Sequence, residues 1–577
     1  MVSRRAFAPL NSGSMANPSK TPIKTPGRHS SLTSEGSLGQ VSCSHCRPGI
    51  CPSRGSLLRK QVSGTSLHPE RQARAAQPAM PRCRRSESVP EPDPVLVFLV
   101  QAMAQTGIPL SEAEFFEGIV VRPLGVRQSL PSVVQLHGNV LPALGRRHES
   151  ALQHAVRNRD AFVFLHEATA GDGRAALGIS LLPLDRVGQS PLLLGIEFLK
   201  QLSQASVARA VAHVLNKGHV LFHRVLAVVT PGNAHMIQAF VDSGILGALL
   251  PAALHVPCLL HQLELVMELW PARLEKMAMV LRLLQDAFGR WAALRHRYQL
   301  FLQERELELS LPLPSMWTGP EAWLEKAIGL AKHLPVLMEF VAAGEEEGAT
   351  MAMLQKLLGE SSQELVAEAT FVVEHGMVLL SMAQFLHKTG EPLAHRVYAE
   401  LDALHIALSY HVDMGFGPNT RSQLALCQPH LAEQFHGILA CSLTRLKHLL
   451  NSHPAMPTLR AVRALDPKQV GAVGWGRLQH EQGIPGLAEV PEVEWFRYQH
   501  LAEAAPANVC LPQWWEAQAE QLPMLSTLAQ RYLWLPVCLP SSPFLPGDIL
   551  SLTDAEEGLT DESVRLWRML RYNRNLC

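Results

Sequence analysis

Residues His255 to Val266, HVPCLLHQLELV, mark the point at which the character of the sequence changes. The stretch begins with a short apolar run typical of a buried strand and continues with apolar residues at helical spacing. Cys258 and His261 are three positions apart, so on a helix they would share one face. The sequence therefore predicts that a buried sheet ends here and that a mainly helical region begins.

Before this stretch, compact apolar runs bounded by polar residues and glycines predict buried strands. The expected strands are Ala161–Leu165, Ala175–Leu182, Pro191–Phe198, Val225–Thr230 and Ala253–Pro257, and the expected helices between them are Ser206–Lys217 and Asn233–Ser243. Three strands, a helix, a strand, a helix and a strand is an order that resembles a ribonuclease-H-like α/β sheet. Periodicity alone leaves several α/β folds open.

After this stretch, apolar residues recur at three and four positions up to about residue 462, as in packed helices. Helices are also expected at both ends of the chain, at Val95–Gln105, Glu112–Ile119, Pro131–Asn158, Gln513–Leu533 and Asp561–Arg571. A chain of 577 residues is too long for a single core. The expected fold is an α/β core interrupted by a large all-α insertion, divided into a tail at 1–92, N-terminal helices at 93–158, the first part of the core at 159–285, the insertion at 286–500, and a C-terminal region at 501–577 that completes the core.

The tail differs in composition from the rest of the chain. Residues 1–90 hold 14 Lys and Arg but only three acids, while the whole chain has 51 of each kind. Rich in Ser, Pro and Gly and without apolar periodicity, the tail is expected to be disordered. Arg82, Arg84 and Arg85 are its candidate DNA-contacting residues, because basic tails bind nucleic acid or direct nuclear import; the alternative is a merely solvated tail.

Cysteine usage and hydropathy restrict the compartment. The ten cysteines show no disulfide-like framework, which favours a reducing environment. The tail holds one local cluster, Cys43, Cys46 and Cys51, but a structural zinc site needs four ligands, so free thiols are the favoured interpretation. We expect no secretory signal and no membrane span, since the longest apolar run, Gly244–Leu260, is broken by Pro251 and Pro257.

Several motifs in the core are similar to those of the hAT transposases, whose relatives include the CGG triplet repeat-binding proteins. The family's V-D-E-T-like strand end corresponds to Phe164–Ala168, FLHEA, and its S-D-N-A-x-x-M motif to Thr230–Met236, TPGNAHM. Its H-V-x-C-x-x-H-x-L-N-L-V motif corresponds to His255–Val266, with Glu264 in place of the Asn. A T-R-W-N-S-W-like turn follows at Ser315–Thr318.

The C-terminal region resembles the dimerisation region of the same family. Trp514 and Trp515 begin a pattern that ends at Pro536, and Leu559–Asn573 is similar to the family's closing helix. The resemblance spans roughly residues 95–573 and implies a ribonuclease-H-like core and a homodimer. The residues expected in the dimer interface or in core packing are Trp514, Trp515, Leu525, Leu528, Tyr532, Leu566 and Leu570.

The resemblance also implies three metal-binding acids that this chain lacks. His166 stands at the first acidic position and Pro231 at the second; the third is placed in a P-S-E-R-like stretch, here around Pro543. Cleavage of a phosphodiester in such a core needs two metal ions held by carboxylates, about 4 Å apart. We therefore expect no transposase or nuclease activity, no catalytic residue and no cofactor.

Cys258 and His261 allow two interpretations. A C-x2-H pair could supply half of a zinc site, with His255 as a third ligand, but no second pair stands nearby in the sequence. A structural role in the core is therefore favoured.

The sequence is compatible with three functions. The first is a domesticated, catalytically inactive transposase that acts in the nucleus by binding proteins, in transcription or chromatin. The second is a DNA-binding protein that uses the basic tail; no BED-type zinc finger is recognisable, so the contacts would be to phosphates and not sequence-specific. The third is a residual enzyme with displaced acids, such as Glu167, Asp172 or Asp548.

Overall fold

The fold is taken from a computed structural model. It describes residues 93–113, 132–169, 173–240, 244–305, 307, 319–344, 348–472, 483–506, 508–540 and 560–576, all of which lie in one compact unit spanning 88–577. The predictions made for other positions lie outside the described residues: the disordered tail with Arg82, Arg84, Arg85 and its cysteines, the motif at Ser315–Thr318, and Asp172, Pro543 and Asp548.

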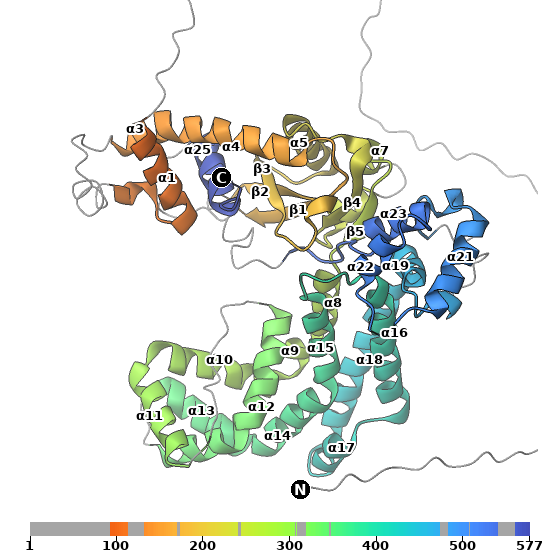
Figure 1. The fold of residues 1–577 in the computed structure, drawn as a ribbon. Coiled ribbons are helices and arrows are strands. Elements are labelled where there is room, and N and C mark those ends of the chain that lie inside the picture. Colours follow the sequence, from red (N-terminus) through yellow and green to blue (C-terminus); the bar gives the residue numbers. More distant parts are fainter. Residues whose placement is uncertain are drawn as a thin grey trace, which may run out of the picture. The chain divides into compact units, whose positions relative to one another are not determined.

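A single mixed sheet of five strands is present among the described residues (Figure 1). The strands are β1 (Ala161–Thr169), β2 (Ala175–Pro183), β3 (Leu192–Leu199), β4 (Val225–Thr230) and β5 (Leu254–Pro257). Their spatial order is β3-β2-β1-β4-β5; β1, β2 and β3 pair antiparallel, and β4 and β5 run parallel to β1. The expected α/β core and its order of elements along the chain are confirmed.

Two elements of the core differ from their expected lengths. β1 continues four residues beyond Leu165, because its pairing with β2 extends to Thr169 opposite Ala175. The helix expected at Asn233–Ser243 is shorter, since α6 covers only Ala234–Gln238. The chain then turns into a second short helix, α7 (Ile245–Leu249), whose Leu246 amide donates to the carbonyl of Ala239.

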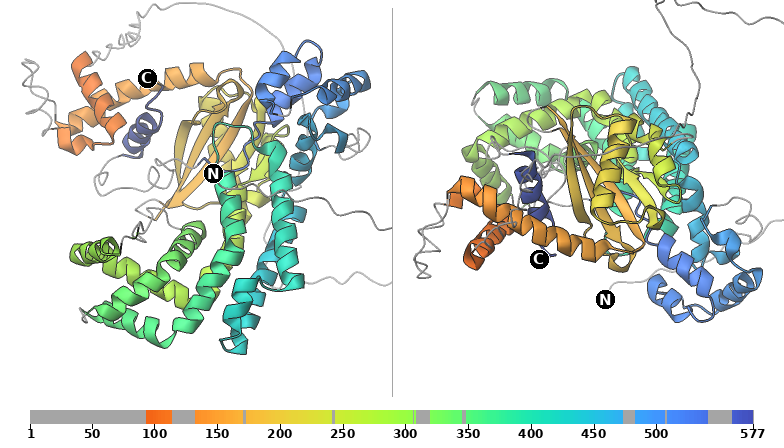
Figure 2. Two further views of the ribbon diagram at one scale, coloured as in Figure 1. Left: turned by 60° about the horizontal axis from the view of Figure 1, so that its bottom comes forward. Right: turned by 90° about the horizontal axis from the view of Figure 1, so that it is seen from above.

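The two faces of the sheet pack against different helices. Alternate residues of a strand point to opposite faces. Phe162, Phe164 and Val229 belong to the large core shared with the helical region, whereas Val163 and Val228 pack in a second core with α5 (Gln204–Lys217), α6 and α7. The edge-on view in Figure 2 shows α5 and α7 on one side of the sheet.

The helical region begins directly after β5, as the sequence predicts. Its helices are α8 (Leu259–Met267), α9 (Leu269–Arg273), α10 (Glu275–Arg290), α11 (Ala292–Gln303), α12 (Pro320–Ala343), α13 (Ala349–Glu360), α14 (Ser362–Phe371), α15 (Met377–Leu386), α16 (Ala394–Met414), α17 (Pro418–Leu424), α18 (Pro429–Ser452) and α19 (Met456–Val462). Stacked aromatic rings lie at its centre, where the Phe371 ring centroid is 5.1 Å from that of Trp270 and 4.2 Å from that of Phe435. Trp270 donates its indole N–H to the hydroxyl of Ser442 at 3.2 Å.

One helical stretch among the described residues, Ser362–Leu386, is long and apolar enough to cross a membrane by length and composition. It comprises α14, α15 and a π-helical turn between them, and 61% of its most apolar window is buried inside the protein. It also carries a buried carboxyl group, Glu368, which accepts a hydrogen bond from the Met277 amide of α10 at 2.7 Å. These contacts are those of a core helix.

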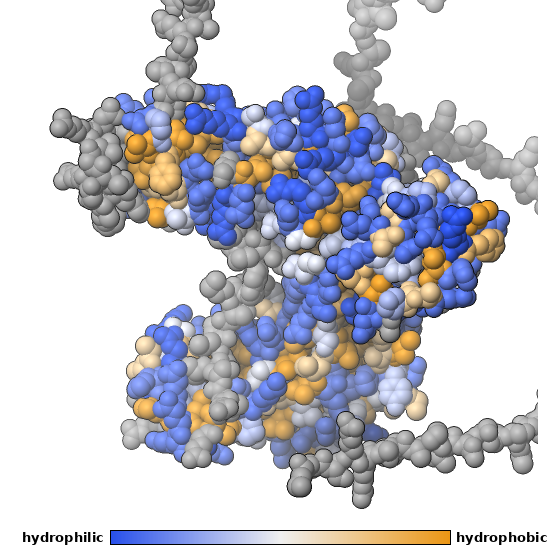
Figure 3. All heavy atoms as spheres, in the orientation of Figure 1, coloured by the Kyte–Doolittle hydropathy of each residue, from blue (hydrophilic) through white to orange (hydrophobic). Residues whose placement is uncertain are grey.

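The helices before the sheet are α1 (Pro94–Thr106), α3 (Val133–Gln135) and α4 (Leu141–Val156), of which α1 and α4 contact the final helix, α25 (Asp561–Tyr572). α4 and α25 approach closely at Gly145, where a Cβ atom would lie 2.6 Å from a methyl carbon of Leu566. On the face drawn in Figure 3, apolar side chains gather over α1 and α3, where Phe98 and Val134 are exposed. The final helix α25 therefore packs against α1 and α4, although it lies at the other end of the sequence.

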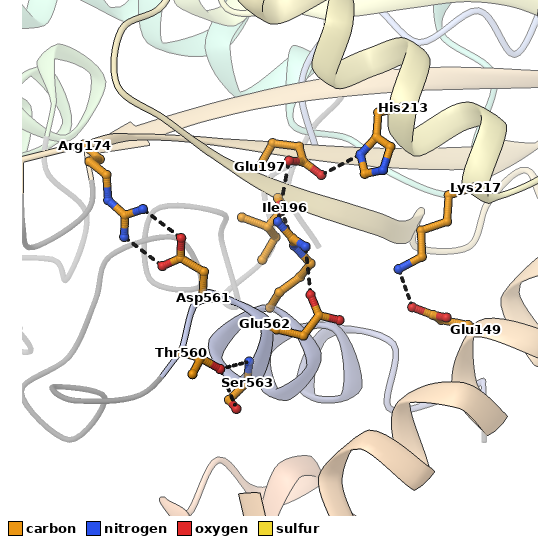
Figure 4. Close-up of polar contacts among 11 residues, drawn as sticks. Glu149, Arg174, Ile196, Glu197, His213, Lys217, Thr560, Asp561, Glu562 and Ser563 are labelled. Atoms are coloured by element: carbon orange, nitrogen blue, oxygen red, sulfur yellow. Dashed lines mark hydrogen bonds and ion pairs between the residues drawn. The ribbon is translucent and has the colours of Figure 1, made fainter. Parts of the chain in front are cut away.

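Charged side chains fix α25 to the sheet (Figure 4). Arg174 at the start of β2 makes two hydrogen bonds of 2.8 Å to the carboxylate of Asp561. Arg565 donates to the carbonyl of Ile196 in β3 at 2.6 Å and lies 3.5 Å from the Glu197 carboxylate. Thr560 caps the helix by accepting from the Ser563 amide at 3.2 Å.

A further C-terminal group of helices comprises α21 (Glu492–Glu503), α22 (Leu511–Ala517) and α23 (Pro523–Tyr532). The single helix expected at Gln513–Leu533 is wrong, because α22 ends at Ala517 and a new helix begins only at Pro523, after the non-helical Leu522. The expected boundaries at 285/286 and 500/501 fall inside α10 and α21. α21 packs with α22 through Tyr498, whose ring centroid is 4.9 Å from that of Trp515.

Candidate functional site at the strand ends of the sheet

His166 lies on β1 at the first of the positions where the resemblance implies an acid. It is two residues beyond Phe164, so its side chain is on the sheet face that meets the large core. It is 4% exposed, and a ring nitrogen, Nε2, is 3.0 Å from the hydroxyl of Ser180 on β2. Burial lowers the pKa of His166 to about 3, so the ring is neutral near pH 7.

Pro231, at the second position, follows the last residue of β4 and is buried. β1 and β4 are parallel neighbours whose last paired residues are Phe164 and Val229, so His166 within β1 and Pro231 directly after β4 each lie two residues beyond this pair. The positions that the resemblance pairs are thus brought together by the sheet register. Neither side chain offers a carboxylate oxygen, the kind of ligand that Mg²⁺ prefers.

The residues next to Pro231 form a closed packing arrangement. Thr230 has its hydroxyl 2.9 Å from Nε2 of His255 on β5, and the Phe240 ring stacks on the His255 ring with a centroid distance of 4.1 Å. Burial, assisted by the neighbouring His453, lowers the pKa of His255 to about 3. Nε2 of His255, a possible third metal ligand in the sequence, is thus engaged with the Thr230 hydroxyl.

Glu167 is the described acid nearest to these positions, and its partners lie on the other face of the sheet. Its carboxylate accepts from the amide of Asn233 at 2.8 Å and lies 3.1 Å from Nε2 of His235 in α6. As expected from strand alternation, Glu167 points away from the face to which His166 points. It therefore does not restore a carboxylate beside Pro231.

Cys258 and His261 lie together, as their spacing predicts. A third segment, around Cys538 and Leu539 near the C-terminus, also contacts Cys258. Cys258 is the buried N-cap residue of α8, and its sulfur accepts a hydrogen bond from the Leu539 amide at 3.2 Å. Burial by itself raises the pKa of Cys258, but its interactions with Cys538, His261 and the Leu539 amide outweigh burial and hold the pKa well below its ordinary value. Among the described residues no group of three or more His, Cys, Asp or Glu is arranged to hold a metal ion.

A cavity of about 340 Å³ lies beside this pair. The sheet contributes Phe164 and Leu182 to its wall, the α15–α16 connection contributes residues 387–393, and the segment after α23 contributes residues 534–540, including Cys538. His387 in this wall is 2.7 Å from the carboxylate of Glu321, a contact that raises the pKa of His387. The cavity thus opens on the same sheet face as His166.

The seven residues expected in the dimer interface or in core packing are all buried within the single chain. Trp515 and Leu525 have no exposed surface, and Trp514, Leu528, Tyr532, Leu566 and Leu570 are at most 8% exposed. The Trp515 indole N–H donates to the carbonyl of Leu465 at 2.9 Å, which ties α22 to the end of the helical region. Intrachain packing accounts for these side chains, and the homodimer stays a prediction.

The sequence does not predict two residues that contact the candidate site, Ser180 and Cys538. Ser180 is joined to His166 only by the register of β1 and β2, and Cys538 is joined to Cys258 only by the return of the chain after α23.

No family model and no curated protein matches the sequence. The function is therefore argued from the geometry of these strand ends.

Proposed function

We propose that this chain is a transposase-derived protein with a ribonuclease-H-like core that acts in the nucleus by binding other macromolecules and not by cleaving DNA. The strand order β3-β2-β1-β4-β5, with three antiparallel strands followed by two strands parallel to β1, supports that core. The motifs quoted above, which occur in the order found in hAT transposases, support the same origin.

The observation that carries the proposal is the identity of the two adjacent strand-end residues. A nuclease of this kind holds two metal ions with carboxylates, and the ions activate the attacking oxygen and stabilise the leaving one. Here these positions, within β1 and directly after β4, carry a neutral imidazole already bonded to Ser180 and a proline without any ligand atom. This pair cannot form the carboxylate cage that the reaction needs.

A displaced acid is a weaker alternative. Glu167 is bonded to Asn233 and His235 on the opposite face, and a single carboxylate does not hold two cations. We therefore favour binding over residual nuclease activity.

The partner class follows from the charge distribution. Residues 1–90 carry an excess of 11 basic residues, 14 against three acids, which suits contact with nucleic acid phosphates or an import receptor. Nonspecific DNA binding through this segment is the second candidate function. It is compatible with the first, because a tail that binds DNA would bring the core to chromatin.

Proximity labelling of the full-length protein in cells, combined with nuclear fractionation, tests the proposal. We expect the protein in the nuclear fraction and chromatin or transcription proteins among the labelled partners. A protein confined to the cytosolic fraction, with no nuclear protein labelled above a control of similar size, would contradict the proposed role.

A further inference from the structure

The N-terminus of α8 and the segment after α23 meet through two cysteines far apart in the sequence. The amide of Leu539 donates to Sγ of Cys258 at 3.2 Å, although the two residues are 281 positions apart. In return, the amide of Leu259 donates to the carbonyl of Val537, the residue before Cys538, at 2.9 Å. These two reciprocal bonds set Cys258 and Cys538 opposite one another, and each thiol shifts the pKa of the other. Both cysteines are free thiols in this structure.

A basic side chain stands beside the pair. His261, one turn into α8, interacts with Cys258, and this interaction raises the pKa of His261. Glu264, a further turn along, adds a favourable charge to His261. His453 also faces Cys258, but its Nε2 lies 2.8 Å from the Pro257 carbonyl and burial lowers its pKa. His261 is thus the residue suited to hold Cys258 as a thiolate, at a helix N-terminus that also favours negative charge.

The second cysteine has access to a void. Cys538 is partly exposed and lies in the wall of the 340 Å³ cavity, whereas Cys258 is buried behind it. A molecule the size of hydrogen peroxide fits such a cavity easily, since one water needs only about 10–15 Å³ of this kind of volume. Cys538 would meet that molecule first.

We propose that Cys258 and Cys538 are a peroxide-sensing pair that forms an intramolecular disulfide. Burial, and then the neighbouring Cys258, raise the pKa of Cys538, so Cys538 is protonated at rest; in the first step it passes its proton to the Cys258 thiolate beside it. The Cys538 sulfur attacks one peroxide oxygen, the O–O bond breaks, and hydroxide leaves; Cys538 is then a sulfenic acid. This inference does not depend on the proposed nuclear role.

In the second step the hydroxide takes the proton from Cys258 and becomes water. The Cys258 thiolate attacks the sulfenic sulfur, the S–O bond breaks, and the departing hydroxide takes a proton from solvent. The two sulfurs lose two electrons in total, and one peroxide is reduced to two waters. The new bond ties the segment after α23 covalently to β5 and α8.

The test uses the purified full-length protein, prepared reduced. The protein is treated with hydrogen peroxide at one to ten equivalents, its remaining thiols are alkylated in denaturant, and it is digested without reduction for mass spectrometry. We expect the linked peptide pair containing Cys258 and Cys538 as the main disulfide product. If both cysteines are recovered as alkylated thiols while the exposed Cys441 and Cys510 are oxidised, the proposal is overturned.

Single-residue variants distinguish specific disulfide formation between Cys258 and Cys538 from general oxidation of the protein's thiols. Cys538→Ser should abolish the linked peptide, whereas Cys441→Ser, at an exposed free thiol, should leave its yield unchanged. His261→Gln should slow disulfide formation about tenfold at pH 7, because more of Cys258 would be protonated, and the difference should shrink at pH 9. Circular dichroism and the unfolding midpoint establish that each variant is folded. An equal rate in His261→Gln at pH 7 would overturn the part assigned to the histidine.

Discussion

On β1, just beyond the last residue paired with β4, the protein carries an imidazole whose surroundings keep it uncharged. His166 is enclosed by the large core and meets the hydroxyl of Ser180. Protonation would place a charge in this apolar enclosure, which is why burial lowers its pKa to about 3. This position is thus part of the folded core, where the neutral imidazole contributes to stability.

The contribution of His166 to the stability of the folded protein should depend on pH. Its pKa is lower in the folded protein than the 6.5 of an unperturbed histidine, so the unfolded chain binds the extra proton between pH 6.5 and about 3. Its contribution to stability is therefore complete above pH 6.5 and is lost as the pH falls, by about 1.4 kcal/mol per pH unit. His166→Gln should show a shallower loss in urea unfolding measured from pH 7.5 to 5. Equal slopes for the two proteins would contradict this assignment.

The contribution of Glu368 to stability should depend on pH in the opposite direction to that of His166. Burial raises its pKa from 4.5 to about 7, against a partial lowering by the amide of Met277, so the folded protein binds the extra proton in this range. Stability is then present below pH 4.5 and lost as the pH rises through 7, by about 3 kcal/mol in total. Glu368→Gln, which can still accept from Met277, should gain stability at pH 8 but not at pH 4.5. The same urea series measures this, and a variant destabilised at pH 8 would contradict it.

The sequence predicts the key residues but not all of their partners. His166, Pro231 and the Cys258–His261 pair follow from motif order and spacing, because these are local properties. Ser180 and Cys538 do not, since only the strand register and the return of the C-terminal segment bring them into contact. A contact between distant positions leaves no periodic signal in a single sequence.

Among the elements, the packing of α4 against α25 depends on one glycine. A Cβ atom on Gly145 would lie 2.6 Å from one methyl carbon of Leu566 and 3.0 Å from the other. Gly145→Ala should therefore force Leu566 aside and lower the free energy of unfolding by about 1–3 kcal/mol. Thermal or urea unfolding measures the change.

Gly289 supplies the matched control. It lies on the exposed side of α10, and an added Cβ would meet nothing within 4 Å. Gly289→Ala should stabilise the protein by about 0.5–1 kcal/mol, because alanine is the better helix former. If both substitutions shift stability in the same direction by similar amounts, the close approach of α4 and α25 is wrong.

Element types follow from the sequence more securely than element ends. The five strands and the change to helices after β5 have clear periodic signals. The extension of β1 to Thr169 and the early end of α6 at Gln238 do not, because pairing with β2 and the Ala239–Leu246 hydrogen bond decide them. Pro523 is a local signal for the division between α22 and α23.

For the whole molecule, the charge excess of residues 1–90 predicts how DNA binding would depend on salt. If the tail carries the contacts, the affinity of the full chain should fall steeply with salt, with a slope of about −0.9 per phosphate contacted. Removal of residues 1–90 should abolish both the binding and the steep slope. Fluorescence anisotropy with a random duplex at several salt concentrations measures this. A truncated protein that keeps the full slope would place the contacts on the folded part instead.

The central claim is that the scaffold of a transposase persists here without its chemistry. The most direct test incubates the purified full-length protein with Mg²⁺ or Mn²⁺ and with DNA that carries candidate inverted repeats, and resolves the products on a denaturing gel. Because His166 and Pro231 supply no carboxylate at the adjacent strand ends, we predict no cleavage or strand transfer above the buffer control. Cleavage that is abolished both by a chelator and by a substitution in this core, such as Glu167→Gln, would contradict the account.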